Sequence, residues 1–312
     1  MWRIFLLLLF YEQGRKLGVT YNYKNCTTLL IRGQRTSSTL IICITYSSSN
    51  VIFTDKKIFI TGGTSGIGRA LVSEFVQRGA THIAVMARRS DRTESLAQEY
   101  PQVNFIKISG DVSVVEDLQR AVSTLQDQWG ILDILINNAG VVSAGPLEDI
   151  SDEDIVQQIN INLTGLVILT KYAMPLLKKS SEGAIMNVSS GLGLIGMPFY
   201  SVYASTKAAV RQFSDALRRE YYQYPLHVMT VYPTATDTPM MENTSASGMD
   251  SPETVAHESV EGLINQEINV IFGGEQRIKD HQMNFESPQE FDKKIAGAYD
   301  SLKKRSTEHR AM

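Results

Sequence analysis

Tyr203 and Lys207 lie four positions apart in a stretch of helical period, and this spacing could support proton transfer. Side chains four residues apart share one face of a helix, so the Lys207 ammonium would lie close to the phenol. A nearby positive charge favours the phenolate and lowers a phenol pKa that is otherwise about 10. Such a tyrosine can give a proton to a carbonyl oxygen or accept one from an alcohol. Chance alone can produce one such Tyr/Lys pair in a chain of this composition. The pair therefore indicates a catalytic role only together with the motifs around it.

A glycine-rich loop from Thr61 to Gly68 follows an apolar run and opens a helical stretch. Glycines let the backbone approach a phosphate, and the N–H groups at a helix start attract its negative charge. The spacing of Gly62, Gly66 and Gly68 differs from the common G-x-G-x-x-G pattern, and a glycine cluster can also be a plain tight turn. Its place between a strand and a helix favours a dinucleotide-binding loop.

The elements that would position these residues alternate regularly from Asp55 onward. Short runs rich in Ile and Val alternate with helical segments, which predicts repeated βα units around a parallel sheet. We expect a single doubly wound α/β domain of Rossmann type with seven parallel strands in the order 3-2-1-4-5-6-7. The expected strands are 57–61, 82–87, 103–108, 132–137, 184–188, 227–232 and 268–272, and helices include 67–78, 114–129, 162–178 and 200–222.

Four motifs then occur in a consistent order along these units. The glycine loop follows the first strand, Asn137 to Gly140 end the fourth, Ser190 follows the fifth, and the Tyr203 pair opens the next long helix. The carboxyl ends of parallel strands form one ligand crevice, so these groups should meet there. With its T-G-x-x-x-G-x-G and Y-x-x-x-K motifs in register, the chain resembles the short-chain dehydrogenase/reductase family over residues 55–275.

The resemblance implies a role for each matched residue. Tyr203 would be the general acid/base, Lys207 would lower its pKa and hold the nicotinamide ribose, and Ser190 would orient the substrate oxygen. Asn162 would support a proton-relay water. Catalytic residues are thus Asn162, Ser190, Tyr203 and Lys207, substrate contacts are Ser190 and Tyr203, and cofactor-binding residues are Gly62, Thr64, Ser65, Gly66, Ile67, Gly68, Arg88, Asp111, Val112, Asn138, Ala139, Gly140, Tyr203, Lys207, Pro233 and Thr238.

Each of these residues also has a plainer interpretation. Asn162 could bridge groups within a helix, and Ser190 could be a turn residue beside Gly191. Asp111, expected to contact adenine, could instead cap the helix that begins near Val114. The family usually has glycine after the proline of its sixth strand, whereas this chain has Thr234 there.

The end of the second strand bears on the choice of cofactor. Family members that use NAD usually carry an acid there, which bonds the ribose hydroxyls and would repel a 2′-phosphate. This chain has Arg88 and Arg89 instead, and a guanidinium offers a charged donor fork for phosphate. We expect NADP(H) in preference to NAD(H), although two arginines could also form a solvated turn. With NADPH as cofactor, the resemblance implies carbonyl reduction as the working direction.

The expected activity is hydride transfer between NADP(H) and a carbonyl or secondary alcohol, as in enzymes acting on CH–OH groups. Apolar residues at 191–199 and Met240, Met241 and Met249 would suit a hydrophobic carbonyl compound, or they could be ordinary core. The alternatives are a 3-oxoacyl-thioester reductase, which would need a basic patch for phosphopantetheine, and a non-catalytic protein that senses NADP(H).

Composition excludes several other classes. Thirty basic and 33 acidic residues give a net charge of -3, too little for a typical nucleic-acid binder. The sequence contains no run of about 18 apolar residues, so it predicts no membrane-spanning helix. The two cysteines, Cys26 and Cys43, predict neither a metal site nor a disulfide framework. The expected partners are a small-molecule substrate and further copies of the chain, because the resemblance implies a homodimer or homotetramer built on the helices at 162–178 and 200–222.

The chain divides by composition into three parts. Residues 1–54 hold one acid, Glu12, among basic, serine and threonine residues, and they are expected to be a disordered or non-catalytic leader. This leader could be a targeting segment or an appended stretch, and cytoplasmic location is expected unless it directs the chain elsewhere. Residues 55–275 would form the catalytic domain, and residues 276–312 a charged C-terminal extension.

Overall fold

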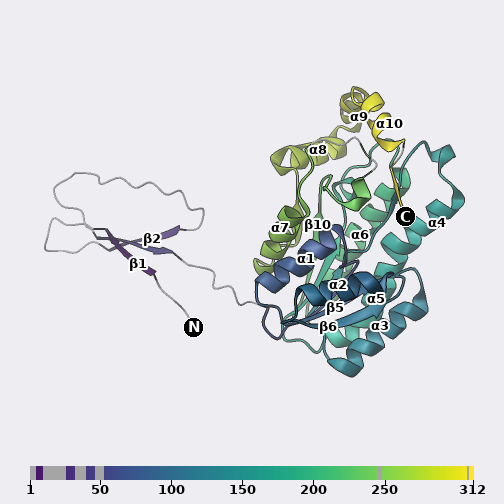
Figure 1. The fold of residues 1–312 in the computed structure, drawn as a ribbon. Coiled ribbons are helices and arrows are strands. Elements are labelled where there is room, and N and C mark those ends of the chain that lie inside the picture. The colour runs from purple at the N-terminus through teal and green to yellow at the C-terminus, as the bar shows by residue number, and fades with distance from the viewer. Residues whose placement is uncertain are drawn as a thin grey trace. The chain divides into compact units, whose positions relative to one another are not determined.

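The computed structural model describes residues 53–242, 244, 248–307 and 309–312, together with three strands nearer the N-terminus. The chain divides into two units, residues 1–52 and 53–312. In the first unit β1 (Phe5–Leu9), β3 (Leu40–Thr45) and β2 (Cys26–Ile31) form an antiparallel sheet in that order (Figure 1). The predictions for the leader otherwise fall outside the described residues.

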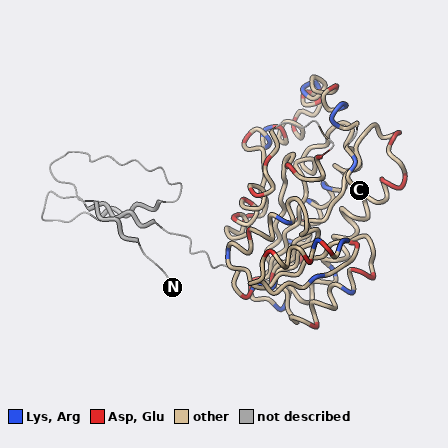
Figure 2. Tube along the Cα trace, in the orientation of Figure 1, with Lys and Arg blue, Asp and Glu red and all other residues tan. Residues whose placement is uncertain are grey.

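The second unit is built on seven parallel strands, as the sequence predicts. Numbered along the chain, the seven lie side by side in the predicted order 3-2-1-4-5-6-7. Only two charged side chains, Lys57 and Lys107, lie within them, whereas the helices carry interspersed acidic and basic residues (Figure 2). The strands are β4 (Lys57–Thr61), β5 (His82–Ala87), β6 (Asn104–Ser109), β7 (Ile134–Asn137), β9 (Gly183–Val188), β10 (Leu226–Tyr232) and β11 (Asn269–Ile271).

Helices cover both faces of this sheet (Figure 1). Residues of α1 (Gly66–Gln77) and α7 (Pro252–Ile264) share one buried apolar cluster with one face. Residues of α3 (Val115–Gln128), α5 (Gly165–Leu177) and α6 (Ser201–Glu220) share a second cluster with the other. The remaining crossover helices are α2 (Ser90–Glu99) and α4 (Asp152–Ile159). Apolar stripes facing the sheet from both sides account for the doubly wound fold.

Two glycines in a left-handed conformation follow helices of the second unit. Gly79 follows α1 with φ +87°, and Gly130 follows α3 with φ +68°. These left-handed conformations are favourable for glycine because it lacks a Cβ atom. The predicted helix at 162–178 is less regular: a π-helical turn, Asn160–Thr164, joins α4 to α5.

The C-terminal residues form three more helices and a short strand. The helices are α8 (Gly274–Glu286), α9 (Pro288–Ala296) and α10 (Tyr299–Ser306). Phe291 of α9 is 2% exposed and packs with Leu194, Ile195 and Tyr232, which fixes these helices against β10. The chain then returns as β12 (Arg310–Ala311), antiparallel to β8 (Val142–Ser143). Of the helices described, none is long and apolar enough to cross a membrane.

Candidate active site

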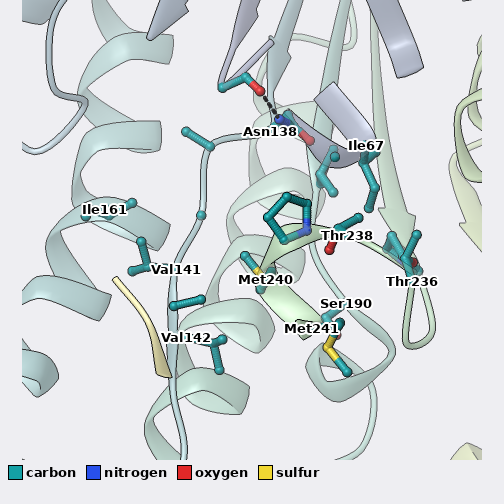
Figure 3. Close-up of a pocket in the computed structure, with 18 of the residues that line it drawn as sticks. Ile67, Asn138, Val141, Val142, Ile161, Ser190, Thr236, Thr238, Met240 and Met241 are labelled. Carbon is teal, nitrogen blue, oxygen red and sulfur yellow. Dashed lines mark hydrogen bonds between the residues drawn. The ribbon is translucent and has the colours of Figure 1, made fainter. Parts of the chain in front are cut away.

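A cavity of about 520 Å³ lies at the carboxyl ends of the parallel strands (Figure 3). Six strands each contribute the residues that follow them, as a doubly wound sheet requires of a ligand crevice. Those residues are Gly62 after β4, Arg88 after β5, Asp111 after β6, Asn138 after β7, Ser190 after β9 and Pro233 after β10. All the predicted site residues lie on the wall of this cavity except Gly68 and Asn162.

The glycine loop is shaped to let an anion approach the start of α1. Gly62 and Gly66 have φ values of +68° and +50°. A Cβ atom on Gly68 would lie 2.2 Å from the Gly62 carbonyl oxygen, so Gly68 allows the loop to close on the helix. Within the described part of the chain no side chain caps α1, and its first turn contains no acid. The helix start therefore offers unpaired N–H groups and a positive dipole end to the cavity.

The loop after β7 is tied to the glycine loop. Thr61 Oγ1 accepts hydrogen bonds from the backbone nitrogens of Asn138 and Ala139, both at 3.1 Å. Asn138 Nδ2 donates to the carbonyl oxygens of Thr61 and Gly62 at 3.0 and 3.2 Å. Figure 3 shows one of these bonds. These bonds explain why Asn138 is needed at this point: it holds the two loops together along one wall.

The charge on the described cavity wall is strongly positive. Its only acid is Asp111, whose Oδ1 accepts bonds from the backbone and side chain of Ser113. Helix α3 begins with Val114 as its N-cap, so Asp111 does not cap it. Arg88 also donates to the Met312 carbonyl oxygen at 3.5 Å. The cations on this wall are Arg88, Arg89, Arg92, Lys207, Arg277 and Arg305.

Ser190, Tyr203 and Lys207 meet at the cavity, but the pKa of Tyr203 is opposite to the sequence expectation. Lys207 Nζ lies 5.8 Å from the centre of the Tyr203 ring and donates to the Val188 carbonyl oxygen at 3.0 Å. Burial raises the pKa of Tyr203 to about 12, against a smaller lowering by the Ser190 hydroxyl, and burial lowers the pKa of Lys207 to about 8. Removal from water therefore outweighs the hydrogen bond from Ser190.

Asn162 is buried beside this group rather than on the cavity wall. Its Oδ1 accepts from the Val141 backbone nitrogen at 2.8 Å, and its Nδ2 donates to the Val141 carbonyl oxygen and to Thr206 Oγ1. A Cβ atom on Gly140 would lie 3.3 Å from both Asn162 Oδ1 and Lys207 Nζ. The asparagine thus ties the loop after β7 to α6, and its role toward a relay water stays a prediction.

The loop after β10 lines the cavity next to the glycine loop. Thr234, which stands where the family usually has glycine, donates its hydroxyl hydrogen to the Asp250 carboxylate. The Thr238 methyl carbon lies 3.1 Å from the position of a Cβ atom on Gly66, so these two residues face each other. Met240 and Met241 line the cavity as the sequence suggests (Figure 3), whereas Met249 does not.

The sequence assigned no site residue to the C-terminal part, yet the structure places several there. His309 accepts a hydrogen bond from the Tyr200 hydroxyl at Nδ1, 2.9 Å away, and donates from Nε2 to the Met240 carbonyl oxygen at 3.0 Å. Helix α8 contains no fully buried residue, so no apolar periodicity marks it as part of the fold. The unforeseen lining residues include Tyr200, Arg277, Leu302, Arg305, His309, Ala311 and Met312.

No group of three or more His, Cys, Asp or Glu side chains that could hold a metal ion occurs among the described residues.

Comparison with known proteins gives a consistent result. The family model described as short chain dehydrogenase matches residues 56–248. The chain is 39% identical over 171 residues to 11-beta-hydroxysteroid dehydrogenase-like 4A of Arabidopsis thaliana. The aligned residues cover 54% of this chain and 56% of that protein. It thus spans little more than half the length of that relative. It is 32% identical to the NADP-dependent 3-hydroxy acid dehydrogenase of Schizosaccharomyces pombe, over 59% of this chain and 72% of that one.

A solved structure resembles the fold of the second unit. The short-chain dehydrogenase from Sphingobium yanoikuyae in complex with NADPH superposes with a TM-score of 0.66 at 25% sequence identity. The superposition covers 79% of this chain and 94% of that one. The fold and the order of its elements are therefore shared with a protein that binds NADPH.

Proposed function

This chain belongs to the short chain dehydrogenase family, and we propose from this premise that it is an NADP(H)-dependent oxidoreductase that reduces a carbonyl group to an alcohol. One observation carries the proposal. Tyr203 and Ser190 share a single cavity with an uncapped helix start and with Arg88. Acid–base groups and a place for phosphates are thus within reach of one bound dinucleotide and its substrate.

The residues present fit the cofactor. The N–H groups at the start of α1 have no acidic neighbour and suit a pyrophosphate, and a Cβ atom on Gly66 would crowd Thr238 at 3.1 Å. Arg88 follows β5 and suits the 2′-phosphate of NADP(H). When bound, the nicotinamide supplies or accepts the hydride.

Tyr203 would provide the proton in this reaction. A phenol whose pKa lies near 12 keeps its hydrogen at neutral pH, which suits donation to a carbonyl oxygen. Ser190 Oγ accepts from the Leu192 backbone nitrogen at 3.1 Å, so its own hydrogen is directed elsewhere and can reach the same oxygen. Lys207, held by the Val188 carbonyl oxygen, places a positive charge beside the phenol. This charge would favour the phenolate that proton donation leaves behind.

Loss of NADPH absorbance with a panel of aldehydes and ketones tests the proposal, with NADH as the parallel cofactor. Turnover of at least one carbonyl compound, faster with NADPH than with NADH at equal concentration, is the expected result. Tight NADPH binding without turnover of any compound would favour the alternative of a non-catalytic sensor.

We also propose that the chain forms a homodimer or homotetramer through α5 and α6, as the family resemblance implies. Val210 and Leu217 of α6 are buried in the chain's own core, so exposed residues such as Ala208 and Arg219 would make the contact. The mass from sedimentation equilibrium checks this proposal, and a monomer at micromolar concentration would contradict it.

A further inference from the structure

Two arginines of the C-terminal helices reach the reacting end of the cavity. Arg277 of α8 places its guanidinium carbon 3.1 Å from the position of a Cβ atom on Gly191, the residue after Ser190. Arg305 of α10 places its guanidinium carbon 5.9 Å from the centre of the Tyr200 ring. Tyr200 is close enough to Tyr203 for its charge to affect the pKa of that residue. Arg277 therefore lies beside the residue that follows Ser190, and Arg305 lies beside Tyr200 on the wall of the same cavity.

Neither arginine has an anionic partner within the part of the chain that the structure describes. The nearest acid to act on Arg277 is Asp280, which is bound by Lys294 at 2.5 Å and by Gln276 at 2.8 Å. The Nε atom of Arg305 is buried and makes no hydrogen bond to a described residue. Its contact to the Tyr200 hydroxyl is with a neutral group. Asp111, the only Asp or Glu on the described cavity wall, follows β6 at the edge of the sheet opposite β11.

Placing two unpaired guanidiniums close together is energetically unfavourable, which argues that they bind a ligand. Burial and the charge of Arg305 both lower the pKa of Arg277, so two like charges lie close together at half-buried positions. Two glycines also make room for Arg277, because a Cβ atom on Gly191 or Gly273 would lie 3.1 to 3.4 Å from its side-chain atoms. A purely structural arginine would be paired or exposed.

We propose that Arg277 and Arg305 bind an anionic group of the substrate, and that the substrate is a carbonyl compound carrying a carboxylate. A guanidinium presents parallel N–H donors that match the two oxygens of a carboxylate. Leu192, Met197 and Leu302 line the same cavity and suit a short apolar stem between the acid and the carbonyl group. This inference rests on the proposed function, because it names the substrate class of the same site.

The cofactor phosphates are the other possible source of an anion. The start of α1 and Arg88 already offer places for them on the walls after β4 and β5, whereas Arg277 follows β11. Those strands are separated by β7, β9 and β10 in the sheet. This separation favours the substrate as the ligand of the arginine pair.

The test compares 3-oxohexanoate with its methyl ester, which differ in charge but share the reacting carbonyl group. NADPH consumption is measured for the full chain and for Arg277→Gln, Arg277→Lys, Arg305→Gln and the control Lys279→Gln. Lys279 is an exposed residue of α8, with 68% of its side chain accessible, outside the cavity wall. Thermal unfolding shows whether each variant is folded. If Arg277→Gln does not fold, Arg277→Lys still tests the site, because it keeps the positive charge but lacks the paired N–H donors.

We expect kcat/KM for the acid to exceed that for the ester by about tenfold or more, as a charge-assisted pair supplies. Each glutamine variant should raise KM for the acid about tenfold, and Arg277→Lys should raise it by less. The KM for the ester and the Kd for NADPH should change less than about twofold. Equal use of acid and ester would overturn the inference. Arginine variants that weaken NADPH binding instead would assign the pair to the cofactor.

Binding of hexanoate and methyl hexanoate by calorimetry separates this inference from the proposed function. Hexanoate should bind at least about tenfold more tightly than its ester and lose that advantage in Arg277→Gln. If hexanoate binds in this way but no carbonyl compound is turned over, the anion site stands and the proposed activity fails. If both 3-oxo compounds are reduced without preference for the acid, the activity stands and the arginine inference fails.

Discussion

Arg88 is the residue that should decide between the two nicotinamide cofactors. It lines the cavity beyond β5, and no acid other than Asp111 lies on the described wall. Arg88→Ala should weaken NADPH binding about ten- to a hundredfold and leave NADH binding unchanged, because NADH lacks the 2′-phosphate that Arg88 would bind. Fluorescence titration with both cofactors measures this change. Lys279→Ala, at an exposed position of α8 outside the cavity wall, is the control, and equal NADPH and NADH affinity in the unaltered protein would refute the role.

His309 should make stability depend on mildly acidic pH. Burial lowers its pKa from 6.5 to about 4, so the folded chain holds it neutral. As pH falls below 6.5 the unfolded chain binds the proton first, and stability is lost progressively until about pH 4. The full difference corresponds to about 3 kcal/mol. Melting temperatures of the unaltered chain should therefore fall more steeply over this range than those of His309→Gln, and parallel curves would show that His309 contributes nothing.

At this scale the sequence predicts which residues meet better than it predicts their protonation. Motif order is enough to bring Ser190, Tyr203 and Lys207 to one cavity, because strand ends of a parallel sheet converge. The pKa of Tyr203 depends instead on how far each side chain is removed from water and on where Lys207 Nζ points. Those quantities come from packing, and no residue spacing encodes them.

At the scale of elements, β12 holds the C-terminal residues against the active-site loops. Arg310 donates to both oxygens of Asp154 in α4, at 2.8 and 3.0 Å, and Ser143 of β8 donates to the same carboxylate. This pairing lowers the pKa of Asp154, so its contribution to stability is present at neutral pH and lost as pH falls through that lowered value. The ion pair thus joins β12 to α4, although Arg310 and Asp154 are 156 positions apart in the sequence.

Arg310→Ala tests this connection. It should lower the free energy of unfolding by about 1 to 3 kcal/mol, because the Asp154 side chain, only 8% exposed, would lose its charged donors. Urea unfolding at neutral pH measures the loss. Lys279→Ala removes an exposed pair with Glu275 and should cost less than about 0.5 kcal/mol. A loss in Arg310→Ala no larger than in this control would mean that β12 does not depend on the ion pair.

The predicted strands agree closely with the structure because buried parallel strands read as continuous apolar runs. The C-terminal elements escaped prediction for the opposite reason. Helix α8 has no buried residue, and β12 has two residues held by one backbone pairing and one ion pair. Such long-range contacts leave no local pattern, so the wall made by Arg277, Arg305 and His309 is visible only in the folded chain.

For the whole molecule, residues 1–50 should be dispensable for catalysis. Every described residue of the cavity wall lies between Gly62 and Met312, and the parallel sheet begins at β4. A chain starting at Val51 should keep kcat/KM within about twofold of the full chain with NADPH and the best carbonyl compound. A folded chain that loses more than about tenfold, or about 1.4 kcal/mol of transition-state stabilisation, would place the leader in the active enzyme.

The most direct test of the proposed reaction is the turnover of Tyr203→Phe measured beside its NADPH affinity. Removal of the phenolic oxygen takes away the proton donor and leaves the glycine loop, Arg88 and Lys207 in place. We expect kcat to fall about 10²- to 10⁴-fold while the Kd for NADPH changes less than about threefold. Tyr222→Phe, at a side chain that is 77% exposed, should behave like the unaltered chain. Retention of a tenth or more of the original kcat in Tyr203→Phe would contradict the account.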